Sequence, residues 1–139
     1  MNTQNLTFKY KLQTLPVIVL ALLNKKAGPY SLLEFLKPAW KDLNTLVAQN
    51  QSHRESVLKL VHSRRERLAI CHYFELSQRI LKEQRQALEI LEKHLEKPSE
   101  FLLKRALAQY EKSARLQKAS VKVRLNLPVL ACEKLSRAS

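Results

Sequence analysis

Glycine is almost absent from this chain of 139 residues, with Gly28 as the only one. Loops that cradle the phosphates of a nucleotide need several glycines, because a side chain would keep the backbone from approaching the phosphate closely. The P-loop and the dinucleotide-binding fingerprint are therefore excluded. We expect no cofactor.

Cysteine is also scarce, since Cys71 and Cys132 are the only two. They cannot form the disulfide framework of a small secreted domain, so we expect a reducing, cytoplasmic setting. No Cys-x-x-Cys pair is present, and the adjacent residues Cys71 and His72 point about 100° apart on a helix. The sequence predicts neither a metal site nor a catalytic centre, and we expect that the protein is not an enzyme.

Long hydrophobic runs are missing as well. The longest, LPVIVLALL at Leu15–Leu23, has nine residues, whereas a transmembrane helix needs about 20. It lacks the small-residue cleavage site of a signal peptide and continues directly into Asn24, Lys25 and Lys26. We expect no membrane partner.

Acidic residues are few for the number of basic ones. The chain has 25 Lys and Arg against 12 Asp and Glu, which gives a formal net charge of +13. Repulsion among so many like charges is relieved when a polyanion binds, so the composition favours nucleic acid as the partner. An acidic protein surface is the alternative.

Prolines and helix-capping patterns divide the first half of the chain. Pro16 fits the first turn of a helix over residues 16–26, and Gly28 and Pro29 predict a turn. Pro38 then restarts or kinks the chain. The Ser-x-x-Glu pattern of an N-terminal capping box predicts helix starts at Ser31 with Glu34 and at Ser52 with Glu55.

The segment from Ser52 to Lys97 contains neither Gly nor Pro and predicts the longest helical stretch. Apolar residues recur within it every seven positions, which is typical of long helices that pack side by side. Val61 and Leu68 are out of phase with this seam, so we expect a kink or break near Cys71–Tyr73. The seam consists of Phe74, Leu81, Leu88 and Leu95.

Two terminal stretches alternate apolar and polar residues as strands do, LTFKYKL at 6–12 and VKVRLNL at 121–127. One interpretation pairs them in a two-stranded ribbon, because an isolated strand leaves its backbone groups unbonded. The alternatives are helix ends with accidental alternation, or a strand added to a neighbouring subunit.

We therefore expect a mainly α fold, a bundle of four to six helices, in a single domain over residues 1–139. Residues 1–15 form a basic arm or strand and residues 16–119 the helical body. Residues 120–139 form a basic strand or arm followed by a short helix.

The chain ends hold most of the surplus charge, with ten basic and three acidic residues at 97–139. On a helix that begins near Pro98, Arg115 and Lys118 both fall within about 40° of Lys104, interrupted only by Glu111. Long flexible cations without interleaved glycine or aromatic residues suit phosphate contacts rather than base reading. The predicted nucleic-acid-binding residues are Lys104, Arg115, Lys118, Lys122 and Arg124, with Lys9 and Lys11 as secondary contributors.

This profile of a small, helical, cysteine-poor and strongly basic chain resembles the small subunit of class 1 CRISPR effector complexes, over roughly residues 16–119. The resemblance implies a helical bundle that lines a nucleic-acid groove in antiviral defence and stacks as repeated copies beside other subunits. Separately, HRESVLKLVHSRRERLA followed by EQRQALEILEKHLEK is similar to the helical region of primosomal replication protein C.

The sequence thus favours a non-catalytic subunit of a nucleoprotein complex that binds the nucleic-acid backbone without regard to sequence, whether DNA or RNA. Two alternatives stay open. One is an adaptor that engages a partner helix through the Phe74–Leu95 seam. The other is a helix-turn-helix DNA-binding accessory protein, because residues 15–49 can be laid out as three short helices with Pro38 in a turn.

Overall fold

The computed structural model describes residues 12–127 and 129–138, and in these the chain forms five α-helices and one 3-10 turn. The turn η1 (Leu12–Thr14) leads into α2 (Leu15–Leu23). Three long helices follow, α3 (Pro29–Leu60), α4 (Arg64–Glu96) and α5 (Glu100–Leu125), and α6 (Val129–Ala138) comes last. The predicted mainly α bundle of four to six helices is confirmed.

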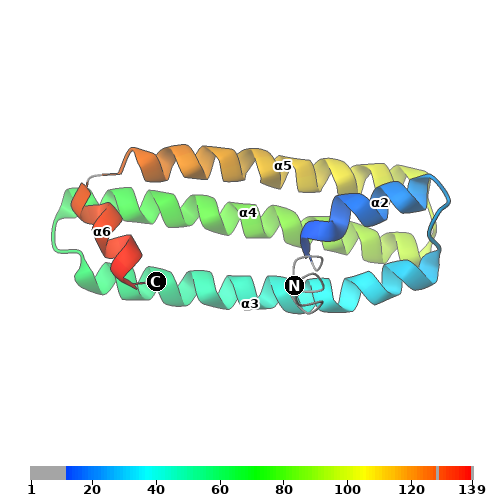
Figure 1. Ribbon diagram of the computed structural model, residues 1–139, viewed down its shortest axis with the longest axis horizontal. Helices are drawn as coiled ribbons and strands as arrows, with labels where there is room; N and C mark the ends of the chain where they lie inside the picture. The colour runs from blue at the N-terminus through cyan, green and yellow to red at the C-terminus, as the bar shows by residue number, and fades with distance from the viewer. Residues whose placement is uncertain (1–11, 128, 139) are drawn as a thin grey trace, which may run out of the picture.

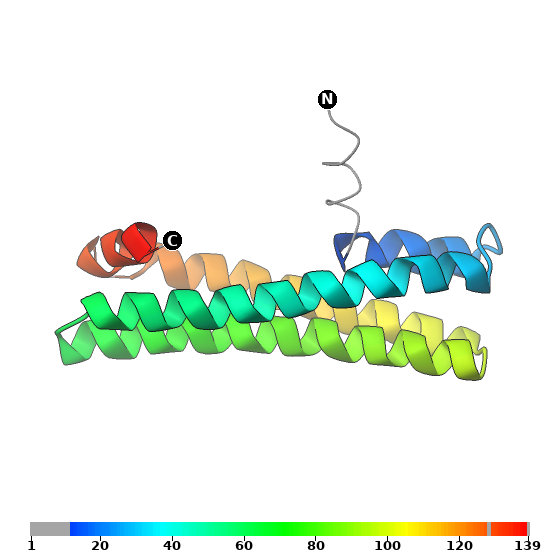
Figure 2. The ribbon, with the colours of Figure 1, turned by 90° about the horizontal axis from the view of Figure 1, so that it is seen from below.

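The three long helices lie side by side along the length of the molecule (Figure 1). Short turns at 61–63 and 97–99 reverse the chain, so α3 and α5 both run antiparallel to α4 and pack against it. The short helices α2 and α6 lie on the same side of this layer, at opposite ends (Figure 2). Helix α2 packs on α5 and α3, and α6 packs on α3 and α4.

Two separate hydrophobic clusters hold the bundle together. The larger lies at the α2 end, where Val19 and Leu36 pack with Leu88 and Leu103. The smaller lies at the α6 end, where Val57 and Phe74 pack with Leu135. Along α3 the larger cluster ends at Leu43 and the smaller begins at Val57, so the middle of the bundle lies between two cores.

The heptad seam belongs to these cores. Phe74 and Leu88 are fully buried, and Leu81 and Leu95 pack half-buried against the larger cluster. The expected long-helix packing is present, but the seam faces the protein's own helices. It does not offer the free surface that the adaptor alternative requires.

The first helix begins as predicted, with Pro16 in the first turn of α2. It ends at Leu23 rather than at residue 26. Lys25 adopts a left-handed conformation with φ of 58°, and the amide of Lys26 donates to the carbonyl of Ala21 at 2.8 Å. This arrangement closes a helix end by satisfying its last carbonyls, and the left-handed position is filled by lysine instead of the usual glycine.

The predicted helix starts at Ser31 and Ser52 are wrong, because α3 runs without interruption from Pro29 to Leu60 and passes through Pro38. Gly28 is the N-cap, and Pro29 occupies the first helical turn, where its missing N–H is not needed. The helix-turn-helix outline is therefore wrong as well. Residues 29–60 form one long helix, not the second and third helices of such a unit.

A break does divide the long segment, but it lies at Val61–Ser63 instead of Cys71–Tyr73. Ser63 is the N-cap of α4, and its hydroxyl oxygen accepts a hydrogen bond from the amide of Glu66 at 3.3 Å. Ser99 caps α5 in the same way, accepting from the amide of Leu102 at 3.4 Å. Pro98 separates α4 from α5, as predicted.

The strand interpretation of residues 121–127 is wrong, and the alternative of a helix end with accidental alternation is confirmed for residues 121–125. Residues 121–125 form the last turns of α5, and a helix satisfies its backbone without a partner strand. The helical body therefore extends beyond residue 119. Of the proposed pairing segment, residues 6–11 lie outside the described residues, and Leu12 belongs to η1.

Candidate nucleic-acid interface

Four cations share one exposed side of α5. Lys104, Arg115, Lys118 and Lys122 are all exposed, and we call them the basic stripe. Because α5 continues as a helix to Leu125, Lys122 follows Lys104 by eighteen residues, which is about five full turns. The stripe therefore runs straight along the helix for about 27 Å.

The charge of α5 differs from that of its neighbour. Helix α5 has seven basic and two acidic residues, whereas α4 has seven basic and six acidic. Within the stripe, Lys104 pairs with Glu100 at 3.2 Å, and both side chains are well exposed. Exposed pairs of this kind hold their partners weakly, so Lys104 remains available to another anion.

The remaining stripe cations make no ion pair with any described residue (12–127 and 129–138). Arg115, Lys118 and Lys122 therefore face solvent without an ion-pair partner among the described residues, and the exposed Glu111 lies on the same side of α5. A row of such cations attracts a polyanion by simple electrostatics, and the attraction weakens as salt rises.

Arg124 lies apart from the stripe. It comes two residues after Lys122 and therefore about 200° further around α5. The structure thus brings together four of the seven predicted binding residues and places Arg124 on another side of the same helix. Lys9 and Lys11 lie outside the described residues.

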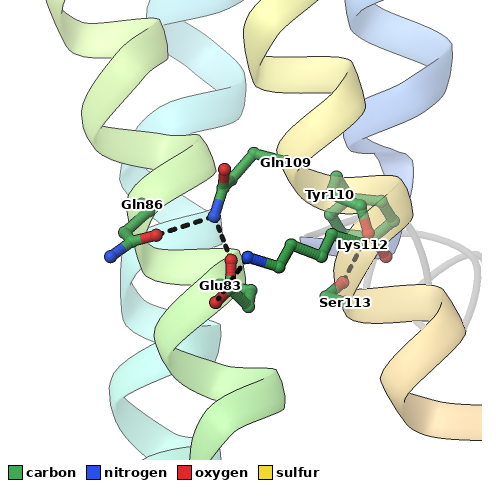
Figure 3. Close-up of polar contacts among 6 residues, drawn as sticks. All are labelled: Glu83, Gln86, Gln109, Tyr110, Lys112 and Ser113. Atoms are coloured by element: carbon green, nitrogen blue, oxygen red, sulfur yellow. Dashed lines mark hydrogen bonds and ion pairs between the residues drawn. The ribbon is translucent and has the colours of Figure 1, made fainter.

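Polar contacts with α4 fix the rotation of α5 (Figure 3). The side-chain amide of Gln109 donates to the carboxylate of Glu83 and, at 2.7 Å, to the side-chain oxygen of Gln86. Lys112 approaches the same Glu83 carboxylate at 3.6 Å. Because Glu83 is buried, its charge needs these partners. The contacts hold Gln109 and Lys112 toward α4 and so turn the stripe toward solvent.

A groove opens over the middle of α4, between α3 and α5. Its volume is about 1340 Å³. Ile80 and Gln84 of α4 form its floor, Gln49 of α3 and Gln117 of α5 contribute to its walls, and residues of η1 and α6 lie at its ends. It coincides with the section between the two hydrophobic clusters.

Sequence analysis did not identify this groove. Its residues come from three long helices and both short end segments, and no single motif groups them. The only signal was indirect: buried positions of α5 change from Leu103 and Ala106 to the small, polar Ser113 and Ser120. Small side chains on one helix leave room beside it, but the sequence does not show which neighbour faces that room.

Tyr110 lies in the groove wall, with its ring packed against the larger cluster. Burial raises the pKa of its hydroxyl, and the nearby carboxylate of Asp42 raises it further. Asp42 also accepts a hydrogen bond from the amide of Leu12 at 3.3 Å, which ties η1 to α3.

The histidines and cysteines are dispersed. No group of three His, Cys, Asp or Glu side chains that could hold a metal ion occurs in the described part of the chain. His53 contacts the carbonyl oxygen of Leu135 at 2.9 Å, and His94 accepts a hydrogen bond from the amide of Ser99 at 3.0 Å. These two side chains stabilise the docking of α6 and the turn between α4 and α5.

Comparisons with protein-family models, with curated proteins and with solved structures give no match for this chain. Among the described residues, no helix has the length and apolar character needed to span a membrane.

Proposed function

We propose that this protein binds the sugar–phosphate backbone of nucleic acid through the basic stripe, without catalysis and without regard to sequence. The observation that carries the proposal is the alignment of Lys104, Arg115, Lys118 and Lys122 on one solvent-facing side of α5. Contacts from lysine and arginine side chains to phosphate oxygens position a protein on nucleic acid and carry no base information.

Four contacts give only modest affinity, because non-specific binding with a few phosphate contacts lies in the micromolar range or weaker at physiological salt. We therefore propose that the protein acts as a subunit of a larger cytoplasmic nucleoprotein complex, beside other subunits or further copies of itself. Several stripes on one nucleic acid would bind far more tightly than one. A CRISPR-type effector complex is one assembly of this kind.

The neighbouring residues Lys122 and Arg124 offer a matched test. Lys122→Glu and Arg124→Glu change the net charge equally, at exposed positions of the same helical turn. Lys122→Glu should weaken binding of a fluorescent oligonucleotide by about tenfold or more, since a charged hydrogen bond is worth at least about 1.5 kcal/mol. Arg124→Glu should weaken it far less.

Reversal of Lys104, Arg115 and Lys118 together should abolish binding in a salt-sensitive gel shift. For the unaltered protein, the logarithm of affinity should fall with the logarithm of salt concentration at a slope of about −3 to −4. Equal losses for Lys122→Glu and Arg124→Glu would show that net charge, not the stripe, governs binding.

A further inference from the structure

We propose that the groove between α3, α4 and α5 receives unpaired nucleobases of the strand whose phosphates lie along the basic stripe. This inference rests on the proposed function and specifies it further, because a site for unpaired bases selects single-stranded nucleic acid over a duplex. The structural basis is the position of the groove, its scarcity of charged side chains and one buried hydrogen-bonding group.

The groove lies beside the basic stripe. Groove and stripe are formed by the same stretch of α5, in which Ala114 and Gln117 line the groove while Arg115 and Lys118 belong to the stripe. The two sets lie about a third of a turn apart around the helix. A strand that follows the stripe therefore passes along the edge of the groove. The small side chain of Ala114 at this edge does not obstruct access to the groove.

The groove has few charged side chains although the protein is strongly basic. Nineteen described residues line it, and Asp42 is the only Asp, Glu, Lys or Arg among them, although such residues make up 27% of the chain. A phosphate would thus find no lysine or arginine among the described groove residues and several on the stripe beside it. An uncharged group is the natural occupant, and the bases are the uncharged part of a nucleic acid.

The polar groups of the groove match base edges in kind. Gln49, Asn50, Gln84 and Gln117 all line it, and each side-chain amide offers both donors and an acceptor. Base edges also present donors and acceptors side by side, and Asn and Gln pair with them readily. The apolar side chains of Leu46 and Ile80 and the ring of Tyr110 supply surfaces for base faces.

Gln84 gives the most specific indication. Its side chain is 4% exposed and lines the floor of the groove. Its side-chain oxygen is buried and accepts no hydrogen bond from any described residue. A buried polar atom without a partner is costly, and native proteins rarely leave one unexplained. The ring N3–H of a thymine, or the exocyclic amino group of another base, would donate to this oxygen on entering the groove.

The dimensions fit several bases in a row. Along α3 the section between Leu43 and Val57 is fourteen residues long, which corresponds to about 21 Å. The volume of about 1340 Å³ exceeds the usual range of pockets for one small ligand, about 300–1,000 Å³. In a duplex the bases are paired and stacked inside the helix, so they cannot enter.

The experiment compares three fluorescent probes of equal length: oligothymidine, an abasic strand of deoxyribose phosphate, and duplex DNA. All three offer phosphates to the stripe, but only oligothymidine offers accessible bases. We expect oligothymidine to bind at least about fivefold tighter than the abasic strand, since one stacked base contributes about that factor or more. The duplex should bind no better than the abasic strand.

A pair of glutamine variants localises the effect. Gln49→Glu places a negative charge in the groove, whereas Gln51→Glu places the same charge on an exposed position of α3 that does not line it. Gln49→Glu should bind oligothymidine several-fold more weakly than Gln51→Glu does. The two variants should bind the abasic strand with equal affinity. Both positions are exposed, and circular dichroism would verify that the variants fold.

The possible results separate this inference from the proposed function. If oligothymidine and the abasic strand bind equally and Lys122→Glu weakens both, the stripe binds nucleic acid but the groove does not receive bases. If Gln49→Glu changes neither probe, the groove inference is likewise wrong, and an uncharged peptide becomes the better occupant. If no probe binds at low salt, the proposed function fails as well.

Discussion

Helices α4 and α5 pack along each other for most of their length, yet they serve different purposes. Eleven residues of α4 are buried, and its basic and acidic residues nearly balance. Only four residues of α5 are buried, two of them serines, and its basic residues far outnumber its acidic ones. Helix α4 therefore organises the core, while α5 presents a charged surface. Substitutions in the two helices should separate stability from binding.

The largest expected effect is the loss of a core side chain from α4. Leu88 is fully buried in the larger cluster. Leu88→Ala removes its packing and leaves a cavity, which should lower the free energy of unfolding by about 2–5 kcal/mol. Urea denaturation followed by circular dichroism measures the change.

Leu125 near the end of α5 provides the control, because it is 77% exposed. Leu125→Ala should change the free energy of unfolding by no more than about 0.5 kcal/mol. Similar losses in the two variants would contradict the division between a core helix and a surface helix.

The second effect concerns the start of α4. Ser63 accepts the amide hydrogen bond of Glu66, and Glu66 also pairs with Lys134 of α6 at 2.7 Å. Ser63→Ala should lower the free energy of unfolding by about 1 kcal/mol.

Ser52 is the matched comparison, because the same Ser-x-x-Glu pattern follows it although it lies inside α3. Ser52→Ala replaces an exposed helical serine with the best helix former and should stabilise the protein by a few tenths of a kcal/mol. Opposite signs in urea denaturation would confirm that α4 begins at Ser63. A loss for Ser52→Ala would place the helix start where the sequence pattern suggested.

The two serines show where sequence reasoning succeeded and where it failed. The helical class and the burial of the Phe74–Leu95 seam followed from helix formers and heptad spacing, which are local properties. The out-of-phase Val61 and Leu68 predicted a break near Cys71–Tyr73. That prediction is wrong, because Leu68 and Phe74 lie on the same uninterrupted helix and Leu68 is exposed. The chain breaks instead at Val61–Ser63. The position of the break did not follow, because Ser52 and Ser63 carry the same capping pattern and only tertiary packing decides which one caps a helix.

The candidate site shows the same limit. The alignment of Lys104, Arg115 and Lys118 was predictable from the helical repeat alone. The places of Lys122 and Arg124 depended on whether residues 121–125 continue the helix or form a strand, and alternation over so few residues does not distinguish these cases. The groove depends on which faces of three helices meet, which no short pattern records.

A smaller effect is expected at alkaline pH, through Tyr110 on the inner side of α5. Its pKa in the folded protein lies above the ordinary value of 10.0, because of burial and the carboxylate of Asp42. Above pH 10 the unfolded chain therefore loses this proton before the folded protein does, so stability falls as pH rises toward the folded pKa. The free energy of unfolding of the Tyr110→Phe variant should decline less between pH 9 and 11 than that of the unaltered protein. Parallel urea titrations would test this, and identical slopes would contradict it.

Only a small change in stability is expected from the substitution with the largest expected change in binding. Arg115, Lys118 and Lys122 are exposed and make no ion pair with a described residue. Converting all three to glutamate should leave the free energy of unfolding within about 1.5 kcal/mol of the original, since surface substitutions usually change it by less than 0.5 kcal/mol each. The lower net positive charge would reduce repulsion within the folded protein and so favour a small gain in the free energy of unfolding. A loss comparable to that of Leu88→Ala would mean that the stripe supports the fold, and its place on α5 would then no longer indicate a binding surface.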